Sequence, residues 1–388
     1  MELKEGYKLS EFGFIPNDWE VQTIGEISSP VRGGSPRPAG SPKYFNGSFI
    51  PWLTVAALTN IPISQLYVSE TETFLTQEGS LYSRTLEKGT LIIANSGATL
   101  GVAKILAIKC CANDGIAALL DIDKEISPEY LVYFINTKTK YLREVVATGN
   151  GQPNLNTGLI GNIKIPLPPT LTEQTAIATA LSDTDALINS LEKLIAKKRN
   201  IKQGAMQQLL KPKEGWEVKK LGEICDIKKG EQLNRYTLNE NDHYPVFNGG
   251  VLPSGYTGEW NQNENTIIIS EGGNSCGFVN FIKTKFWQGG HCYSLNTKLD
   301  KEYFYQMLKA REKEIMALRV GSGLPNIQRN RLFDFLIIMP GEEEQNEIAT
   351  ILSDMDAEIQ ALVTKLEKYR KIKLGMMQNL LTGKIRLI

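Results

Sequence analysis

The chain has 388 residues, long enough for two or three domains, and its 43 Lys plus Arg equal its 43 Asp plus Glu. No global positive charge therefore marks it as a nucleic-acid-binding protein, although a local basic patch can exist within a neutral chain. The five cysteines form no CxxC motif, the N-terminus has no apolar signal core, and the most apolar region is interrupted by Lys104 and Lys109. We therefore expect a reduced, cytoplasmic protein without a membrane span.

The first part of the chain, residues 1–170, is predicted to be a globular domain of short strands. Runs rich in β-branched residues at 49–55, 91–94 and 163–167 are bounded by Gly, Pro and Asn. Ser127 before Pro128 predicts the start of a short helix, because serine caps a helix and proline fits its first turn.

A polar loop near the start of this domain has the composition of a DNA contact. Arginine provides a fork of donors that can read guanine, lysine contacts phosphate, and glycine permits close approach. A solvated turn is the alternative. The predicted DNA-binding residues are Arg32, Gly33, Gly34, Ser35, Arg37, Lys43 and Tyr44.

A long helix follows and occurs twice. Residues 173–210 return as residues 344–381 with more than half of the positions identical, and neither copy contains proline. Apolar residues recur at heptad spacing in both copies, which predicts that each helix packs against a partner helix, most naturally the other copy. The predicted interface comprises Ile177, Leu181, Ile188, Leu191, Ile195, Ile348, Leu352, Met355, Ile359, Leu362 and Leu366.

The charge pattern predicts that the two helices are antiparallel. The first half of each is acidic, as at Asp183 and Asp354, and the second half is basic, as at Arg199 and Arg370. Antiparallel pairing places acidic halves beside basic halves, whereas parallel pairing would place like charges together.

The repeat extends into the globular parts, so the chain is a tandem duplication. The motif Trp19-Glu-Val followed by Ile24-Gly-Glu-Ile returns as Trp216-Glu-Val followed by Leu221-Gly-Glu-Ile, and a Pro-Asn loop at 149–156 returns at 321–328. We predict an α+β fold with two mixed-sheet domains, 1–170 and 213–341, and two spacer helices, 171–212 and 342–388. The DNA-binding candidates of the second domain are Lys228, Lys229, Gln232, Asn234, Arg235 and Tyr236.

Motifs for small-molecule chemistry are absent from the sequence. His243 and His291 are the only histidines, and neither has metal-ligand spacing. The glycine runs lack the residues of a phosphate-binding loop, so tight turns are the expected interpretation. We predict neither a catalytic residue nor a metal site.

The ordered motifs resemble those of the specificity subunit of type I restriction–modification systems. The resemblance runs nearly end to end, through Gly13-Phe-Ile-Pro-Asn-Asp-Trp-Glu-Val, Gly33-Gly-Ser-Pro-Arg, Gly89-Thr-Leu-Ile-Ile, Gln152-Pro-Asn-Leu-Asn, Ile165-Pro-Leu-Pro-Pro and their repeats. The second domain departs from it, since Lys229-Gly-Glu-Gln stands in place of Gly-Gly-Ser-Pro.

This resemblance implies a non-catalytic subunit that recognises double-stranded DNA. Each globular domain would read one half of an asymmetric bipartite site, and the helix pair would set the spacer and dock two modification (methyltransferase) subunits. Restriction subunits, which act as endonuclease and translocase, would complete the complex, and S-adenosylmethionine, ATP and Mg would be bound by partner subunits. A coiled-coil protein scaffold without DNA binding is the alternative function.

Overall fold

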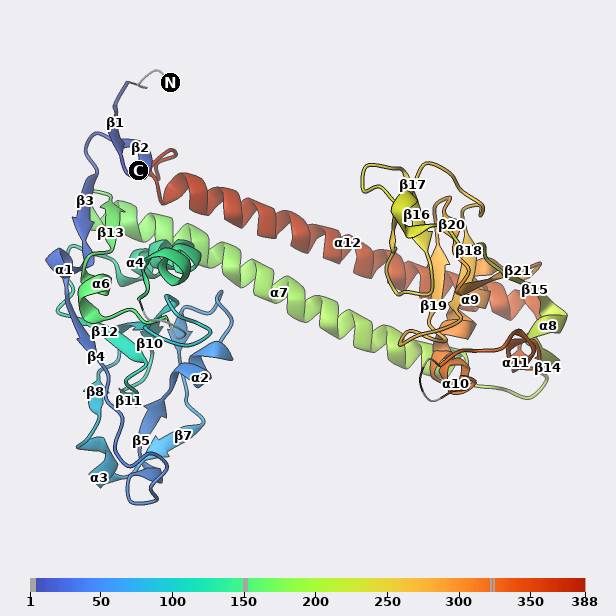
Figure 1. The fold of residues 1–388 in the computed structure, drawn as a ribbon, viewed down its shortest axis with the longest axis horizontal. Coiled ribbons are helices and arrows are strands. Elements are labelled where there is room, and N and C mark those ends of the chain that lie inside the picture. Colours follow the sequence, from blue (N-terminus) through green and yellow to red (C-terminus); the bar gives the residue numbers. More distant parts are fainter. Residues whose placement is uncertain (1–4, 149–152, 322, 324, 388) are drawn as a thin grey trace. The chain divides into compact units, whose positions relative to one another are not determined.

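The computed structural model describes residues 5–148, 153–321, 323 and 325–387, and it divides into two compact units. Unit 1 comprises Met1–Lys193 and Thr364–Ile388, and unit 2 comprises Leu194–Val363. Each unit therefore contains one globular part together with one end of each long helix (Figure 1). The division differs from the predicted boundaries, which assigned the helices to segments of their own.

Unit 1 contains two mixed sheets and two small two-stranded sheets. The strand orders are β4-β12-β9-β10-β6 and β7-β5-β11-β8, and the small sheets pair β1 with β2 and β3 with β13. The strands are β1 (Tyr7–Ser10), β2 (Gly13–Pro16), β3 (Glu20–Thr23), β4 (Ser29–Arg32), β5 (Phe45–Leu53), β6 (Tyr67–Val68), β7 (Thr73–Leu75), β8 (Arg84–Leu86), β9 (Leu91–Ala94), β10 (Ala103–Leu106), β11 (Cys110–Ala112), β12 (Ile116–Leu120) and β13 (Lys164–Leu167).

Short helices cover the sheets of unit 1, and the long helix α7 follows them. Helix α4 packs against β10 and begins at the predicted cap, where the Ser127 hydroxyl accepts a hydrogen bond from the Tyr130 N–H. The helices are α1 (Ile24–Ile27), α2 (Val55–Thr59), α3 (Gln77–Ser80), α4 (Pro128–Thr137), α5 (Thr139–Tyr141), a π-helical turn (Leu142–Val146), α6 (Thr157–Gly161) and α7 (Leu171–Leu209).

Unit 2 repeats this plan in a smaller form. Its sheets have the orders β15-β21-β18-β19 and β17-β16-β20, with β14 paired to β22. The elements are β14 (Glu217–Lys220), α8 (Leu221–Ile224), β15 (Cys225–Lys229), a 3₁₀ turn (Arg235–Thr237), β16 (Tyr244–Phe247), β17 (Gly255–Thr257), β18 (Thr266–Ser270), β19 (Val279–Ile282), β20 (Trp287–Gln288), β21 (Cys292–Thr297), α9 (Lys301–Ala310), α10 (Glu312–Ala317), α11 (Arg329–Phe333), β22 (Leu336–Met339) and α12 (Glu342–Leu380).

The duplication is visible in strand order as well as in sequence. The order β4-β12-β9-β10 of unit 1 matches β15-β21-β18-β19 of unit 2, and all of these neighbours are antiparallel. In the second sheets, β11 pairs with β5 in parallel as β20 pairs with β16. The predicted α+β duplication is thus confirmed, including strand pairs whose sequences no longer resemble one another.

The repeated Gly-Glu pair has a physical explanation in both units. Glu26 and Glu223 each accept a hydrogen bond from the backbone N–H three residues earlier, at 2.6 Å and 2.9 Å, which caps a one-turn helix. A β-carbon at Gly222 would lie 1.9 Å from Phe333 of α11, and one at Gly25 would lie 3.3 Å from Gly161 of α6. Glycine therefore lets the capped turn approach the next helix.

The two long helices are antiparallel within each unit. In unit 1, Lys373 near the end of α12 forms an ion pair with Asp185 near the start of α7, at 2.6 Å. In unit 2, Lys202 near the end of α7 forms the equivalent pair with Asp356 of α12, also at 2.6 Å. The predicted pairing of basic and acidic halves is therefore confirmed.

The predicted helix interface is buried to different degrees. Ile177 and Leu181 belong to the core of unit 1, and Ile348 and Leu352 belong to the core of unit 2, so the start of each helix packs on a globular part as well as on the other helix. Residues 188, 191, 195 and 366 are also buried, whereas 355, 359 and 362 are half-buried.

The Pro-Asn loops lie partly outside the described residues, at 149–152, 322 and 324. Their described parts contact the central strands, since the Leu155 N–H donates to the Asn95 carbonyl and the Ile327 N–H donates to the Glu271 carbonyl, both at 2.8 Å. All five cysteines are buried and free, and no helix in the described chain is long and apolar enough to cross a membrane.

Lys104 on β10 gives unit 1 a dependence on pH. Its side chain is fully buried, and its ammonium group donates to the carbonyls of Pro62 and Gln65, at 2.6 Å and 2.5 Å. Burial lowers the pKa of Lys104 from 10.5 to about 8. Between these values the unfolded chain holds a proton that the folded chain has lost, so this residue makes stability rise with pH across that window.

We therefore expect Lys104→Met to remove part of the rise in unfolding free energy between about pH 8 and about pH 10.5. Urea denaturation at several pH values would measure it. Lys109→Met is the matched control, because Lys109 is exposed and pairs with Glu87. Equal pH profiles for the wild type and Lys104→Met would contradict the assignment.

Candidate nucleic-acid interface

Arg32 stands at the end of β4, on the exposed side of a shallow recess of about 560 Å³ in unit 1. Its Nε donates to the backbone carbonyl of Asp114 at 2.7 Å, and Arg84 Nε donates to the carbonyl of Arg32 at 2.7 Å. The two guanidinium groups therefore flank one recess although the residues are far apart in the sequence. Arg84 was not among the predicted site residues.

The two glycines after Arg32 have different roles. A β-carbon at Gly33 would lie 2.2 Å from the Asn113 carbonyl oxygen, so this glycine is needed for packing within the domain. A β-carbon at Gly34 would meet its nearest neighbour at 3.6 Å, an ordinary contact. Gly34 lines the recess and leaves room for a ligand, whereas Gly33 fixes the loop on the sheet.

Asp114 organises the rest of this loop. Ser35 donates to its Oδ1 at 2.7 Å, and the Arg37 guanidinium lies 3.6 Å from its Oδ2 while remaining 74% exposed. An exposed ion pair of this kind contributes little to stability, so Arg37 can exchange the carboxylate for another anion.

Lys43 and Tyr44 lie at the other end of the same connection between β4 and β5, and Tyr44 reaches the recess through Tyr82. Lys43 forms an ion pair with Glu78 at 2.7 Å, and the Tyr44 ring lies 5.2 Å from the ring of Tyr82, which lines the recess. The structure thus brings the predicted residues of the first domain to one region and adds Tyr82 and Arg84. Their signal in the sequence is a Tyr-Ser-Arg run within a turn, which is too common to have been selected.

The second domain places Lys229 where the first places Arg32. The Gly33 N–H donates to Ile116 and the Gly230 N–H donates to Cys292, each across to the neighbouring strand. A β-carbon at Gly230 would lie 2.3 Å from the Gly289 carbonyl, as the one at Gly33 would from Asn113. The structure therefore aligns Lys229 with Arg32 and Gly230 with Gly33, one residue away from the alignment seen in the sequence, and the residues after these glycines still differ.

Lys229 lines a cleft of about 650 Å³ whose other polar side chains were not predicted from the sequence. Its ammonium lies 2.6 Å from Glu271 Oε1, which also accepts a hydrogen bond from Tyr293 at 3.0 Å. His291 lies 3.8 Å from the other carboxylate oxygen. That oxygen is buried without a hydrogen-bond partner in the described structure.

Glu271 and Asn95 occupy equivalent positions, at the ends of β18 and β9. Each accepts a hydrogen bond from the Pro-Asn loop on its backbone carbonyl, and each is followed two residues later by a glycine with positive φ, Gly273 (+74°) and Gly97 (+78°). Asn95 Oδ1 is also buried without a partner among the described residues. The glycine turns at Gly97 and Gly273 therefore follow one polar residue at the same position in each unit, Asn95 in unit 1 and Glu271 in unit 2.

The remaining candidates of the second domain do not all gather with Lys229. Lys228 pairs with Asp226 at 3.2 Å, and Gln232 lines a neighbouring recess of about 440 Å³. Asn234 accepts from the Tyr236 N–H at 3.1 Å, and the Tyr236 side chain is 96% exposed. The side chain of Arg235 lies outside the described residues. The described residues include no cluster of acidic, cysteine or histidine side chains suited to a metal ion.

Comparison with known proteins identifies the family. The sequence model of the type I restriction modification DNA specificity domain matches residues 16–203 and again residues 213–370. The chain belongs to this family. The two matched segments correspond to the two copies of the repeated strand order, each of which is followed by one long helix.

The similarity to relatives in the family extends over nearly the whole length of the chain. The MjaIX specificity subunit of Methanocaldococcus jannaschii is 27% identical, over 98% of this chain and 96% of the relative, and the MjaVIII specificity subunit is 26% identical, over 96% and 94%. The crystal structure of a type I restriction-modification S subunit from M. genitalium has a TM-score of 0.68 at 17% identity and covers 98% of both chains. The specificity-domain fold is therefore shared from end to end.

Proposed function

We propose that this chain is the DNA sequence-recognition subunit of a type I restriction–modification complex, with each globular part reading one half of an asymmetric bipartite site. One observation carries the proposal: a single backbone frame holds different polar groups at equivalent positions in the two units. Arg32 corresponds to Lys229, and Asn95 corresponds to Glu271. Arginine presents a planar fork of donors to a guanine edge, whereas lysine presents a single ammonium. The buried Asn95 and the partly buried Glu271 give the two cations different surroundings, so the two frames suit different half-sites.

The other subunits of the complex would bind to this chain and supply the catalytic activities. The pair formed by α7 and α12 sets the spacing of the half-sites and docks two modification subunits, and restriction subunits join them. Catalysis lies in these partners, which bind S-adenosylmethionine, ATP and Mg, and the complex acts in the cytoplasm. The names of the curated relatives, specificity subunits of type I restriction enzymes, support this assignment.

Reconstitution with the modification subunit tests the function. Sequencing of methylated adenines in the host genome should return one bipartite asymmetric motif, and the reconstituted complex should retard a duplex carrying it more strongly than a scrambled duplex. Equal retardation of both duplexes, or none, would favour a coiled-coil scaffold that binds only proteins.

Single substitutions at the two equivalent cations should act on separate half-sites. We expect Arg32→Ala to relax recognition in the first half-site only and Lys229→Ala in the second only, each costing about 1–3 kcal/mol of binding to the cognate duplex. If either cation contacts a phosphate instead of a base, the same change would weaken binding to all duplexes uniformly and reduce the salt dependence of binding.

Arg37→Ala belongs in the same experiment, because Arg37 is highly exposed beside Asp114. Lys219→Ala is the control, since Lys219 lies on β14 and pairs with Glu217. Wild-type affinity of Arg32→Ala, Arg37→Ala and Lys229→Ala across duplexes and salt would show that these loops are only turns.

A further inference from the structure

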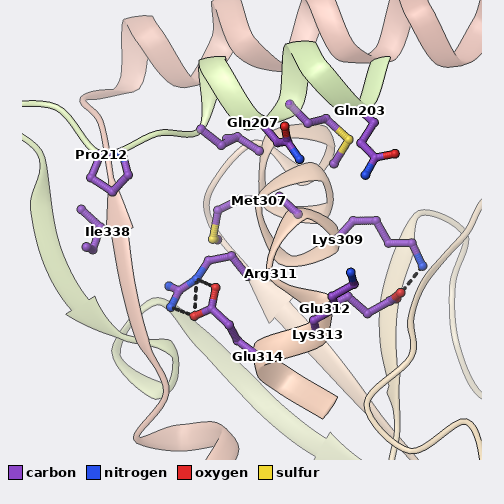
Figure 2. A pocket seen from close by; sticks show the side chains of 13 residues that line it. Gln203, Gln207, Pro212, Met307, Lys309, Arg311, Glu312, Lys313, Glu314 and Ile338 are labelled. Carbon is purple, nitrogen blue, oxygen red and sulfur yellow. Dashed lines mark hydrogen bonds and ion pairs between the residues drawn. The ribbon is translucent and has the colours of Figure 1, made fainter. Parts of the chain in front are cut away.

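Unit 2 has a groove of about 790 Å³ between the C-terminal turns of α7, the end of α9 and strand β22. Figure 2 shows Met307 at its centre and the ion pairs Lys309–Glu312 and Arg311–Glu314 along one side. Gln203 and Gln207 reach it from α7, and Pro212 and Ile338 lie at the other end. This groove is separate from the polar clefts assigned to DNA.

The equivalent surface of unit 1 is covered by the hairpin of β1 and β2. Phe12, at the turn of that hairpin, contacts Phe134 of α4, with ring centroids 5.5 Å apart and planes nearly perpendicular. Lys138 places its ammonium 5.0 Å from the Phe12 ring. The hairpin also contacts the end of α12, since the Tyr7 hydroxyl donates to the Gly383 carbonyl at 3.2 Å and Ile15 is fully buried in the shared core.

The helices that form the two surfaces, α4 and α9, have equivalent residues. Helices α4 and α9 start at equivalent caps, Ser127 and Asp300, so Phe134 corresponds to Met307 and Lys138 corresponds to Arg311. The groove in unit 2 is therefore the hairpin-binding surface without its hairpin. Only residues 210–216 join α7 to β14, which is too short a connection to form a hairpin before Trp216.

We propose that this groove is a docking site for a protein partner that presents a β-hairpin with an aromatic side chain at its turn. The duplicated frame specifies the occupant, because unit 1 binds such a hairpin on the same helix ends. The partner's aromatic ring occupies the groove above Met307, which lines it although this residue is only 3% exposed. The ring lies beside the Arg311 side chain, as Phe12 packs on Phe134 beside Lys138. The inference rests on the fold and is independent of DNA recognition.

The chain's own hairpin supplies the probe. The Asn17 N–H donates to the Gly6 carbonyl at 3.0 Å, so a peptide of residues 6–17 can be cyclised by joining its ends. A fluorescently labelled peptide should bind the full chain saturably with one site, measured by anisotropy, since the equivalent surface of unit 1 is already covered. A Phe12→Ala peptide should bind about tenfold more weakly or worse, because it lacks the aromatic ring, which is partly buried against α4 in unit 1.

Two matched variants locate the site. Gln207→Trp places a bulky ring in the groove wall and should weaken peptide binding at least about tenfold. Gln208→Trp is the control and should leave peptide binding unchanged, because Gln208 is exposed and lies outside the groove. A chain with residues 6–18 inserted directly before Trp216 should lose peptide binding, because its own graft fills the groove. The proposal is overturned if the peptide does not saturate at millimolar concentration, or if the Gln207→Trp or grafted chain binds it like the wild type.

Discussion

A chain ended after Lys213 is expected to form a homodimer that recognises a symmetric DNA site. The truncation removes the segment Thr364–Ile388 from unit 1 and with it Leu380 and Leu381, which complete the core around Ile177 and Leu181. Exposing those side chains forfeits about 1.5–3 kcal/mol for each large one. A monomer of the fragment would therefore have an unstable first domain.

A second copy of the fragment can replace the missing segment. The end of α7 is a near-copy of the end of α12, and it supplies Leu209 and Leu210 in place of Leu380 and Leu381. Lys202 would stand beside Asp185, where Lys373 stands in the full chain, because the two ion pairs are equivalent. The resulting interface is self-complementary, as two-fold symmetry requires.

Light scattering and methylation mapping with the modification subunit would test this. The expected result is a dimer whose methylated motif consists of the first half-site and its inverted repeat. A folded monomer, or a dimer that still modifies the original asymmetric site, would refute the internal two-fold relation.

Lys373→Met is expected to destabilise unit 1 by about 3–5 kcal/mol. The Asp185 side chain is 5% exposed, and its carboxylate is held by the Lys373 ammonium at 2.6 Å and the Tyr133 hydroxyl at 3.0 Å. Removing the ammonium leaves a buried carboxylate without its paired cation, and the cost of desolvating that charge then dominates.

The equivalent pair in unit 2 is the control. Asp356 is 44% exposed, so Lys202→Met should cost only about 0–1 kcal/mol. Hydrogen exchange of backbone amides in each unit would measure the local loss, since the two effects fall in different units. The double change Lys373→Met with Asp185→Asn should recover part of the stability, and equal losses from the two lysine variants would contradict the role of burial.

The sequence predicted the helices, the duplication and the family, because these depend on periodicity and on repeated local motifs. Strand β9 (Leu91–Ala94) and the cap of α4 were predicted at their observed positions. The pairing of β11 with β5 and of β20 with β16 could not be predicted, since parallel pairing joins segments distant in sequence and leaves no local signal.

The sequence allowed the candidate site to be predicted only in the loop at residues 32–37, where glycine and arginine occur close together. Arg84 reaches Arg32 through folding, and Glu271 becomes a cleft residue only because β18 pairs with β21, which pairs with β15 on its other side. The equivalence of Lys229 with Arg32 also required the structure, because a one-residue shift of register is invisible when the surrounding sequences have diverged.

The division into units determines the order in which the two units can complete their contacts during protein synthesis. Unit 2 is one continuous segment, Leu194–Val363, and all of its contacts are available once residue 363 has left the ribosome. Synthesis of unit 1 begins earlier, but unit 1 is completed later, because the hydrogen bond from Tyr7 to Gly383 and the ion pair of Arg386 with Asp18 join the two ends of the chain. The domain made first is thus completed last, and a nascent chain stopped before residue 364 would carry one finished unit and one with an open core.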